Sequence, residues 1–159
     1  MSSDEFTIRI GDPISAPELL PPEDPLGELS PLQMGLKRFC FERNHVVVIN
    51  MGDDALRVSL YPDVCLLLDW LPARLAELRA GRRAVLELPE SMMAIELMPE
   101  DHSVHGVWRK FGYSREMKSW RFDRSTVIDA LDQFFRELLR RAVEAGYVTA
   151  EDADGALRE

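Results

Sequence analysis

The feature that most constrains the fold is a long amphipathic segment, predicted to be a helix from Ser125 or Thr126 to Ala145. Its apolar residues recur at the helical period: Val127, Ile128, Leu131, Phe134, Phe135, Leu138, Leu139 and Ala142. Gly146 follows the last of them and predicts the end of the helix. A stripe of this width and length needs a broad apolar surface, which an open β-sheet provides. We therefore expect an α+β fold in which this helix covers one sheet face.

Alternating apolar and polar residues predict the strands of that sheet. A β-hairpin is predicted over residues 45–60, where HVVVIN and ALRVSL flank the turn MGDD. Four further runs joined by short turns predict an antiparallel meander: RAVLEL, MAIELM, SVHGVWRKF and MKSWRF. FTIRI, at residues 6–10, predicts one more strand whose edge could pair with a second copy, so a homodimer stays open. The predicted fold class is α+β, an antiparallel sheet of about six strands with helices packed on one face.

The remaining helices are predicted from their capping signals. Ser30 as N-cap, Pro31 at the first position and Gln33 as the capping-box partner predict a helix to about Arg43. Asp63 is expected to cap a second helical stretch to Ala80, which Pro72 should break near Leu71. TAED predicts a short helix at the C-terminal end.

Length and charge divide the chain into an arm and a body. The 159 residues, of which 46% are hydrophobic, suit a single domain over residues 1–159. Six of the ten prolines lie in residues 12–31, which predicts a Pro-rich acidic arm over 11–31 before a folded body over 32–159. Residues 1–32 hold seven acids and one base, so −6 of the net charge of −9 belongs to the arm side.

The cellular location is predicted from the apolar runs, the first residues and the cysteines of the sequence. The longest wholly apolar run, VCLLL, is far shorter than the roughly 20 residues that a membrane-spanning helix needs. MSSDEF at the start lacks the pattern of a secretory signal. Cys40 and Cys65 lie among apolar neighbours, which is typical of buried reduced thiols. We expect a cytoplasmic protein that does not bind membranes.

The segment 108–122 gathers cations and aromatic rings in an otherwise acidic chain. Such a mixture is typical of surfaces that bind single-stranded nucleic acid, although a half-buried hairpin with solvated arginines has the same composition. A nucleic-acid-associated protein is therefore one alternative. The candidate binding residues of this segment are Trp108, Arg109, Lys110, Phe111, Tyr113, Arg115, Lys118, Trp120 and Arg121.

The arm supplies the other candidate contact residues, which are the acids Glu18, Glu23, Asp24 and Glu28. They predict a protein partner, with a basic surface as the complementary one. Alternatively, the arm could neutralise the basic hairpin of its own chain. A small acidic α+β domain without a catalytic motif is similar in type to the immunity proteins of bacterial toxin systems. That similarity, which no shared motif carries, implies a non-catalytic binding protein of the inhibitor kind.

Enzymatic and metal-binding alternatives have weaker support in the residues. No GxSxG motif, Walker loop or dinucleotide-binding glycine pattern is present, so we predict no catalytic residues and no cofactor. A small-molecule enzyme would need a pocket with convergent carboxylates, for which Glu87, Glu90 and Glu96 are available. His102 and His105 are three apart on a predicted strand and point to opposite faces, so we predict no metal site.

Overall fold

The computed structural model describes residues 3–15, 20–112 and 116–158. Its strands form two antiparallel sheets in place of the single sheet that the sequence predicts. The first sheet has the order β1-β2-β3, with bounds Phe6–Pro13, His45–Met51 and Asp54–Ser59. The second has the order β4-β5-β6-β7, with bounds Ala84–Leu88, Met93–Glu100, Ser103–Lys110 and Met117–Asp123. The α+β class, the hairpin and the four-stranded meander are thus confirmed.

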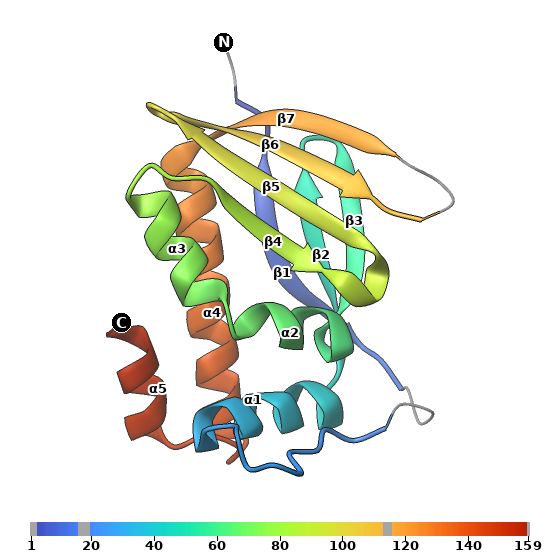
Figure 1. Ribbon diagram of the computed structural model, residues 1–159, viewed down its shortest axis with the longest axis vertical. Coiled ribbons are helices and arrows are strands. Elements are labelled where there is room, and N and C mark those ends of the chain that lie inside the picture. Colours follow the sequence, from blue (N-terminus) through green and yellow to red (C-terminus); the bar gives the residue numbers. More distant parts are fainter. Residues whose placement is uncertain (1–2, 16–19, 113–115, 159) are drawn as a thin grey trace.

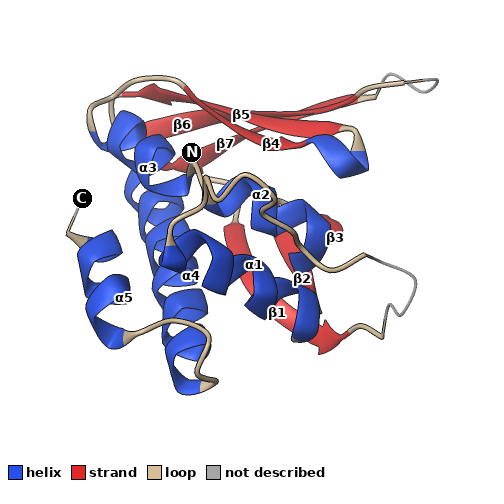
Figure 2. Ribbon diagram, turned by 60° about the horizontal axis from the view of Figure 1, so that its bottom comes forward, coloured by secondary structure: helices blue, strands red, loops and turns tan. Residues whose placement is uncertain are grey.

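The helices lie on the inner side of the four-stranded sheet, and no described helix or strand covers its outer face (Figure 2). Helix α4 extends along both sheets at one side of the molecule and packs on β1 (Figure 1). The helical elements are α1 (Pro31–Glu42), α2 (Cys65–Leu68), α3 (Leu71–Arg79), α4 (Arg124–Glu144), α5 (Ala150–Leu157), a π-helical turn η1 (Leu60–Val64) and a 3₁₀ turn η2 (Pro89–Ser91).

The two sheets meet at the N-terminal segment. Asp4 donates its backbone N–H to the carbonyl of Arg121 and accepts from the Arg121 N–H through its carboxylate. The chain then continues into β1, which pairs with β2. Phe6 at the start of β1 packs edge-on against Phe122 of β7, with ring centroids 5.2 Å apart. One buried cluster therefore runs through both sheets and the helices between them.

The predicted starts of the helices are confirmed for two of them and corrected for two others. Ser30 and Gln33 form the predicted capping box of α1, and Thr149 caps α5. Helix α4 is capped by Asp123, whose carboxylate accepts from the Thr126 N–H and from two nearby hydroxyl groups. The helix therefore begins at Arg124, just before the predicted start at Ser125 or Thr126, because Asp123 supplies its cap.

Asp63 is the second correction, because it is buried and caps no helix. Its carboxylate accepts from the backbone N–H and hydroxyl of Ser59 at 3.1 and 3.2 Å, and from the Ser91 hydroxyl at 2.7 Å. It therefore links the end of β3, in the first sheet, to η2, the turn between β4 and β5 of the second sheet. The helical stretch is interrupted between α2 and α3, as predicted, with Pro72 in the first turn of α3.

Candidate binding surfaces

The aromatic side chains of the basic hairpin belong mostly to the core. Trp108 on β6 is only 8% exposed and donates its indole N–H to the sulfur of Met93 at 3.2 Å. Phe122 on β7 is fully buried, and a side chain at Gly106 on the neighbouring strand would collide with its ring. Because alternate residues of a strand face opposite sides, the tryptophan and phenylalanine both point inward.

Trp120 completes this inward layer. Its ring stacks beside Phe122 at a centroid distance of 6.2 Å and lies against Gly52 in the turn between β2 and β3. A Cβ atom at Gly52 would come within 2.8 Å of the indole ring, so the turn approaches the tryptophan closely. Among the described aromatic residues of the hairpin, only Phe111 is largely open to solvent, at 50% exposure. A row of rings for stacking bases is therefore absent from the described hairpin.

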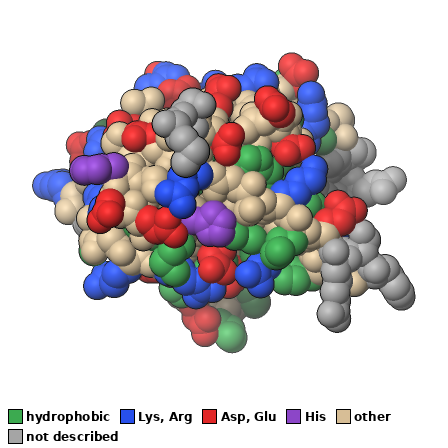
Figure 3. All heavy atoms as spheres, turned by 90° about the horizontal axis from the view of Figure 1, so that it is seen from above, with side chains coloured by type: hydrophobic (Ala, Val, Ile, Leu, Met, Phe, Trp, Pro, Cys, Tyr) green, Lys and Arg blue, Asp and Glu red, His purple; other side chains and the backbone are tan. Residues whose placement is uncertain are grey.

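The cations of the hairpin pair with acids of the two sheets. Lys118 lies 3.0 Å from Asp54, and Arg121 lies 3.1 Å from Glu100. Lys110 and Arg109 are exposed, whereas Tyr113 and Arg115 lie outside the described residues. Figure 3 shows acidic and basic side chains mixed over this end of the molecule. The surface is thus not a continuous cationic track of the kind that nucleic acid requires.

The arm is placed far from this hairpin. It runs beneath α1 at the bottom of Figure 1, while β6 and β7 lie at the top. The arm–hairpin neutralisation is wrong for the described residues, because Lys118, Arg121 and Arg109 pair with acids of the sheets. These cations already have acidic partners on other strands, so the acids of the arm are not needed to neutralise their charge.

The arm presents both acids and apolar side chains to solvent. Leu20 and Leu26 are 82% and 79% exposed, more than any other large hydrophobic residue that the structure describes. Glu23 and Glu28 are exposed and have no ion-pair partner among the described residues. Asp24 differs, since its carboxylate accepts from the N–H groups of Glu28 and Leu29 at 2.9 and 3.0 Å and so holds a turn. Glu18 lies outside the described residues.

A groove of about 480 Å³ separates the arm from α1, η1 and η2. Its acidic side chains are Glu23, Asp24, Glu28 and Glu90. Its one described cation, Lys37, already pairs with Asp69 at 3.3 Å. Tyr61 donates its hydroxyl to the carbonyl of Leu20 at 3.2 Å and so fixes one end of the arm. We call this acidic groove, together with the exposed Leu20 and Leu26, the arm surface.

A second groove, of about 610 Å³, lies on the outer face of the four-stranded sheet. It brings together Glu87 and Glu96, as sequence reasoning anticipated, but Glu90 lies on η2 and faces the other groove. Arg83 binds Glu96 through two contacts of 3.1 Å. This hydrogen bonding, with the charges of Arg83 and Arg109, lowers the pKa of Glu96. The carboxylate is held ionised, so it is poorly suited to act as a general acid at neutral pH.

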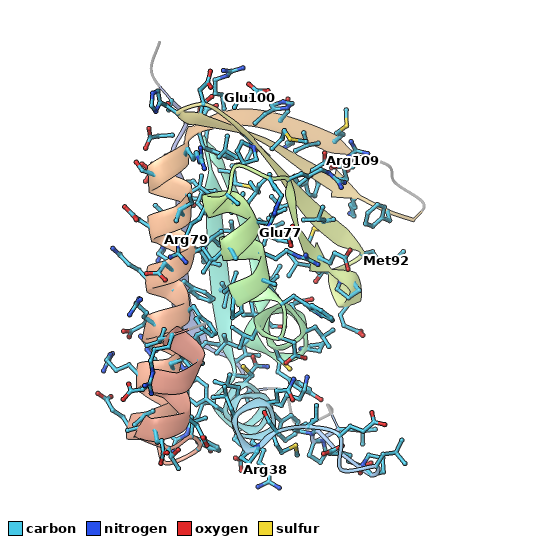
Figure 4. All side chains as sticks on the ribbon, turned by 60° about the vertical axis from the view of Figure 1, so that its left-hand side comes forward. Arg38, Glu77, Arg79, Met92, Glu100 and Arg109 are labelled. Atoms are coloured by element: carbon cyan, nitrogen blue, oxygen red, sulfur yellow. The ribbon has the colours of Figure 1, made fainter. Side chains whose placement is uncertain are left out.

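Sequence reasoning missed several residues of these surfaces. Ala94 forms the hollow of the outer groove, and Met92 forms its rim, where it is visible beside Arg109 in Figure 4. Lys37 of α1 and Tyr61 of η1 line the arm surface although neither belongs to the arm. Only the strand register and the helix packing identify them, and a single sequence does not fix either.

The described histidines and cysteines form neither a metal site nor a reactive thiol. Within the described ranges, no three His, Cys, Asp or Glu side chains are arranged to hold a metal ion. Cys40 and Cys65 are buried free thiols, and burial raises the pKa of both. A thiol with a raised pKa is protonated at neutral pH and is a weak nucleophile.

Two broader observations limit the function. None of the helices in the described part of the chain is both long and apolar enough to cross a bilayer. No family model, no curated protein and no solved structure matches the chain. The functional argument therefore starts from the surfaces themselves.

Proposed function

We propose that this chain is a non-catalytic binding protein whose arm surface docks a basic protein partner. The observation that carries the proposal is the combination of unpaired acids with the two most exposed leucines. Glu23 and Glu28 form no ion pair among the described residues, and the groove they line holds two further acids. Leu20 and Leu26 are the apolar residues that such a partner would cover.

The physical reason is that the two kinds of side chain supply different parts of an association. Acids clustered on one surface attract a basic partner and raise the association rate. Exposed leucines next to them lose water contact when the partner arrives, which slows dissociation. The arm is also attached to η1 by the hydrogen bond from the Tyr61 hydroxyl to the Leu20 carbonyl. A partner would therefore meet a surface that is partly ordered before binding, and the entropy cost of ordering the arm is lower.

The same proposal includes an inhibitor role in the cytoplasm. Immunity proteins are small acidic domains that block a basic toxin by charge complementarity, and the arm surface offers such complementarity. The buried reduced thiols of Cys40 and Cys65 support a reducing compartment. The proposal requires no cofactor, no metal ion and no nucleic acid.

Quantitative affinity capture from the source cells tests this proposal. The test variant Glu23→Gln/Glu28→Gln removes two charges of the arm surface. The matched control Asp129→Asn/Asp154→Asn removes two exposed acids from α4 and α5. We expect one stoichiometric basic protein on the wild-type chain, retained by the control and reduced at least tenfold on the arm variant.

Three results would overturn the proposal. The captured protein could be acidic, the arm variant could retain it as well as the control does, or the wild-type chain could retain nucleic acid and no protein. A salt titration adds an independent readout. Binding by the Leu20→Ser/Leu26→Ser variant should weaken with salt as steeply as binding by the wild-type chain, because the leucines carry no charge. Binding by the Glu23→Gln/Glu28→Gln variant should weaken less steeply, and an unchanged salt slope for that variant would contradict the acids as the source of attraction.

A further inference from the structure

The groove on the outer sheet face has a hollow at its centre because Ala94 is small. In the strand register, Ala94 of β5 is paired with Glu87 of β4 on one side and with Arg109 of β6 on the other. Neighbouring strands are about 4.8 Å apart, so the backbones that carry the acid and the base are roughly 10 Å apart, with the alanine methyl group between them. In the next row, Val85 and Val107 add apolar side chains on the two sides of Glu96, which is the middle residue of that row. The volume of about 610 Å³ suits a small organic molecule.

Arg109 has donors to spare within this groove. Both carboxylate oxygens of Glu96 are already bound by Arg83, at 3.1 Å each. Arg109 reaches the same carboxylate only at 4.0 Å, beyond hydrogen-bonding distance, and its side chain is 51% exposed. The planar guanidinium can therefore receive a second carboxylate through two parallel N–H donors.

We infer that this groove binds a small organic monocarboxylate with a compact apolar body. Its carboxylate group would pair with Arg109, and its apolar body would lie on Ala94 and the two valines. Met92 and Phe111, which are 51% and 50% exposed, border the groove and would close over the apolar body. Both side chains would lose solvent contact on binding, which favours an apolar ligand over a polar one.

The charge balance of the groove selects against other anions. Glu87 and Glu96 line it together with Arg83 and Arg109, so the groove is electrically balanced before a ligand enters. A monocarboxylate adds a single negative charge to this balanced groove and places it on Arg109, which lies beyond hydrogen-bonding distance of Glu96. A nucleotide or another polyanion would bring additional negative charge next to two glutamates and be repelled.

This inference does not depend on the proposed function. The groove faces outward from the four-stranded sheet, where Figure 4 shows Arg109 and Met92 on the side away from α4. The arm surface is built from different residues, although the two grooves approach each other at η2, where Pro89 lines the outer groove and Glu90 lines the arm surface. Loss of either activity therefore leaves the other testable.

Titration with 3-phenylpropionate, followed by amide chemical shifts of the full chain at pH 7, tests the inference. An open groove of this size should bind such a probe with a dissociation constant on the order of 1 mM. The shifts should concentrate at Ala94, Val107 and Arg109. The uncharged analogue 3-phenylpropanamide should bind at least tenfold more weakly, because it cannot form the charge-assisted bonds.

Two variants and a matched control complete the experiment. Arg109→Gln should weaken binding of the acid at least tenfold and bring it level with the amide. Ala94→Leu fills the hollow from a solvent-facing strand position and should abolish binding of both probes. Arg121→Gln removes an exposed arginine of the same sheet outside the groove and should leave binding unchanged.

The inference is overturned if the amide binds as tightly as the acid, or if Arg109→Gln binds the acid as the wild-type chain does. It is also overturned if the groove residues shift when the protein alone is concentrated and do not respond to either probe. That last result would identify a second copy as the occupant of the groove.

Discussion

The basic hairpin and the acidic arm are equally conspicuous in the sequence, yet the structure treats them in opposite ways. In the hairpin, Trp108 and Phe122 are buried and Lys118 has an acidic partner. In the arm, Leu26 is exposed and Glu23 has no ion-pair partner among the described residues. The hairpin thus has the more unusual composition, yet most of its described aromatic rings are buried or partly buried and Lys118 is ion-paired within the fold.

The difference shows that a strand can bury or pair unusual side chains within the fold more completely than a loop can. A strand sends alternate residues to the core and its neighbours supply partners for the rest. A proline-rich segment has no such period, so its side chains keep whatever exposure the local turns give them. For this chain, unpaired side chains are therefore a better guide to a binding surface than residue type.

The largest expected effect tests whether the hairpin aromatics are core. Phe122→Ala should lower the free energy of unfolding by about 3–5 kcal/mol, because it leaves a cavity against Phe6. Phe111→Ala, in the same hairpin, should change it by less than about 0.5 kcal/mol, because that ring is half exposed. Urea unfolding measures both. Similar losses for the two variants would contradict the distinction, and Phe122→Leu provides a milder change if the alanine variant does not fold.

A second effect separates a buried acid from the exposed acids of the arm. Asp63→Ala should cost about 1–3 kcal/mol, because it leaves the Ser59 N–H and the Ser91 hydroxyl without their acceptor. Glu23→Ala should stay within about 0.5 kcal/mol of the wild-type chain. The same urea assay applies, and a loss for Glu23→Ala as large as that for Asp63→Ala would show that the arm acid is structural.

A smaller effect depends on pH. Hydrogen bonds from Arg140 and then Arg141 lower the pKa of Glu137 on α4 from 4.5 to about 2. The folded form therefore holds the carboxylate ionised more strongly than the unfolded chain does, so the contribution is complete above about pH 4.5 and is lost as the pH falls towards 2. Glu137→Gln should cost about 0.5–1 kcal/mol at pH 7. Thermal unfolding of both proteins between pH 7 and pH 2 should show this difference shrinking, and a constant difference would contradict the assignment.

The smallest expected effect belongs to the arm itself. Leu20→Ser/Leu26→Ser should change the free energy of unfolding by less than about 0.5 kcal/mol, because both side chains are already in water. The same variant should weaken capture of the partner severalfold. A large loss of stability would mean that these leucines pack within the fold and do not form a contact surface.

Much of the fold was predictable because its signals are local. The apolar period of α4, the capping box at Ser30 and the alternation in the meander each depend on neighbouring residues only. The arrangement of two sheets was not, because it depends on where the N-terminal segment lies: β1 pairs with β2, while Asp4 and Phe6 contact β7. The contacts with β7 connect residues that are more than a hundred positions apart.

The surfaces were predictable only in part, for the same reason. The acids of the arm could be named from composition, but the groove beside them requires Lys37 and Tyr61 from other elements. Ala94 became visible as the centre of the outer groove only once the strand register was known. Conversely, composition could not show that Trp108 points inward, since that depends on which face of the sheet the helices cover.

Hydrogen exchange of the protein, free and bound to its captured partner, tests the central claim most directly. The account predicts slowed exchange on binding at the arm amides between residues 20 and 30. It also predicts no change in β7, which contributes no residue to the arm surface. Slowed exchange in β6 and β7 with none in the arm would contradict the account and make the hairpin the binding surface.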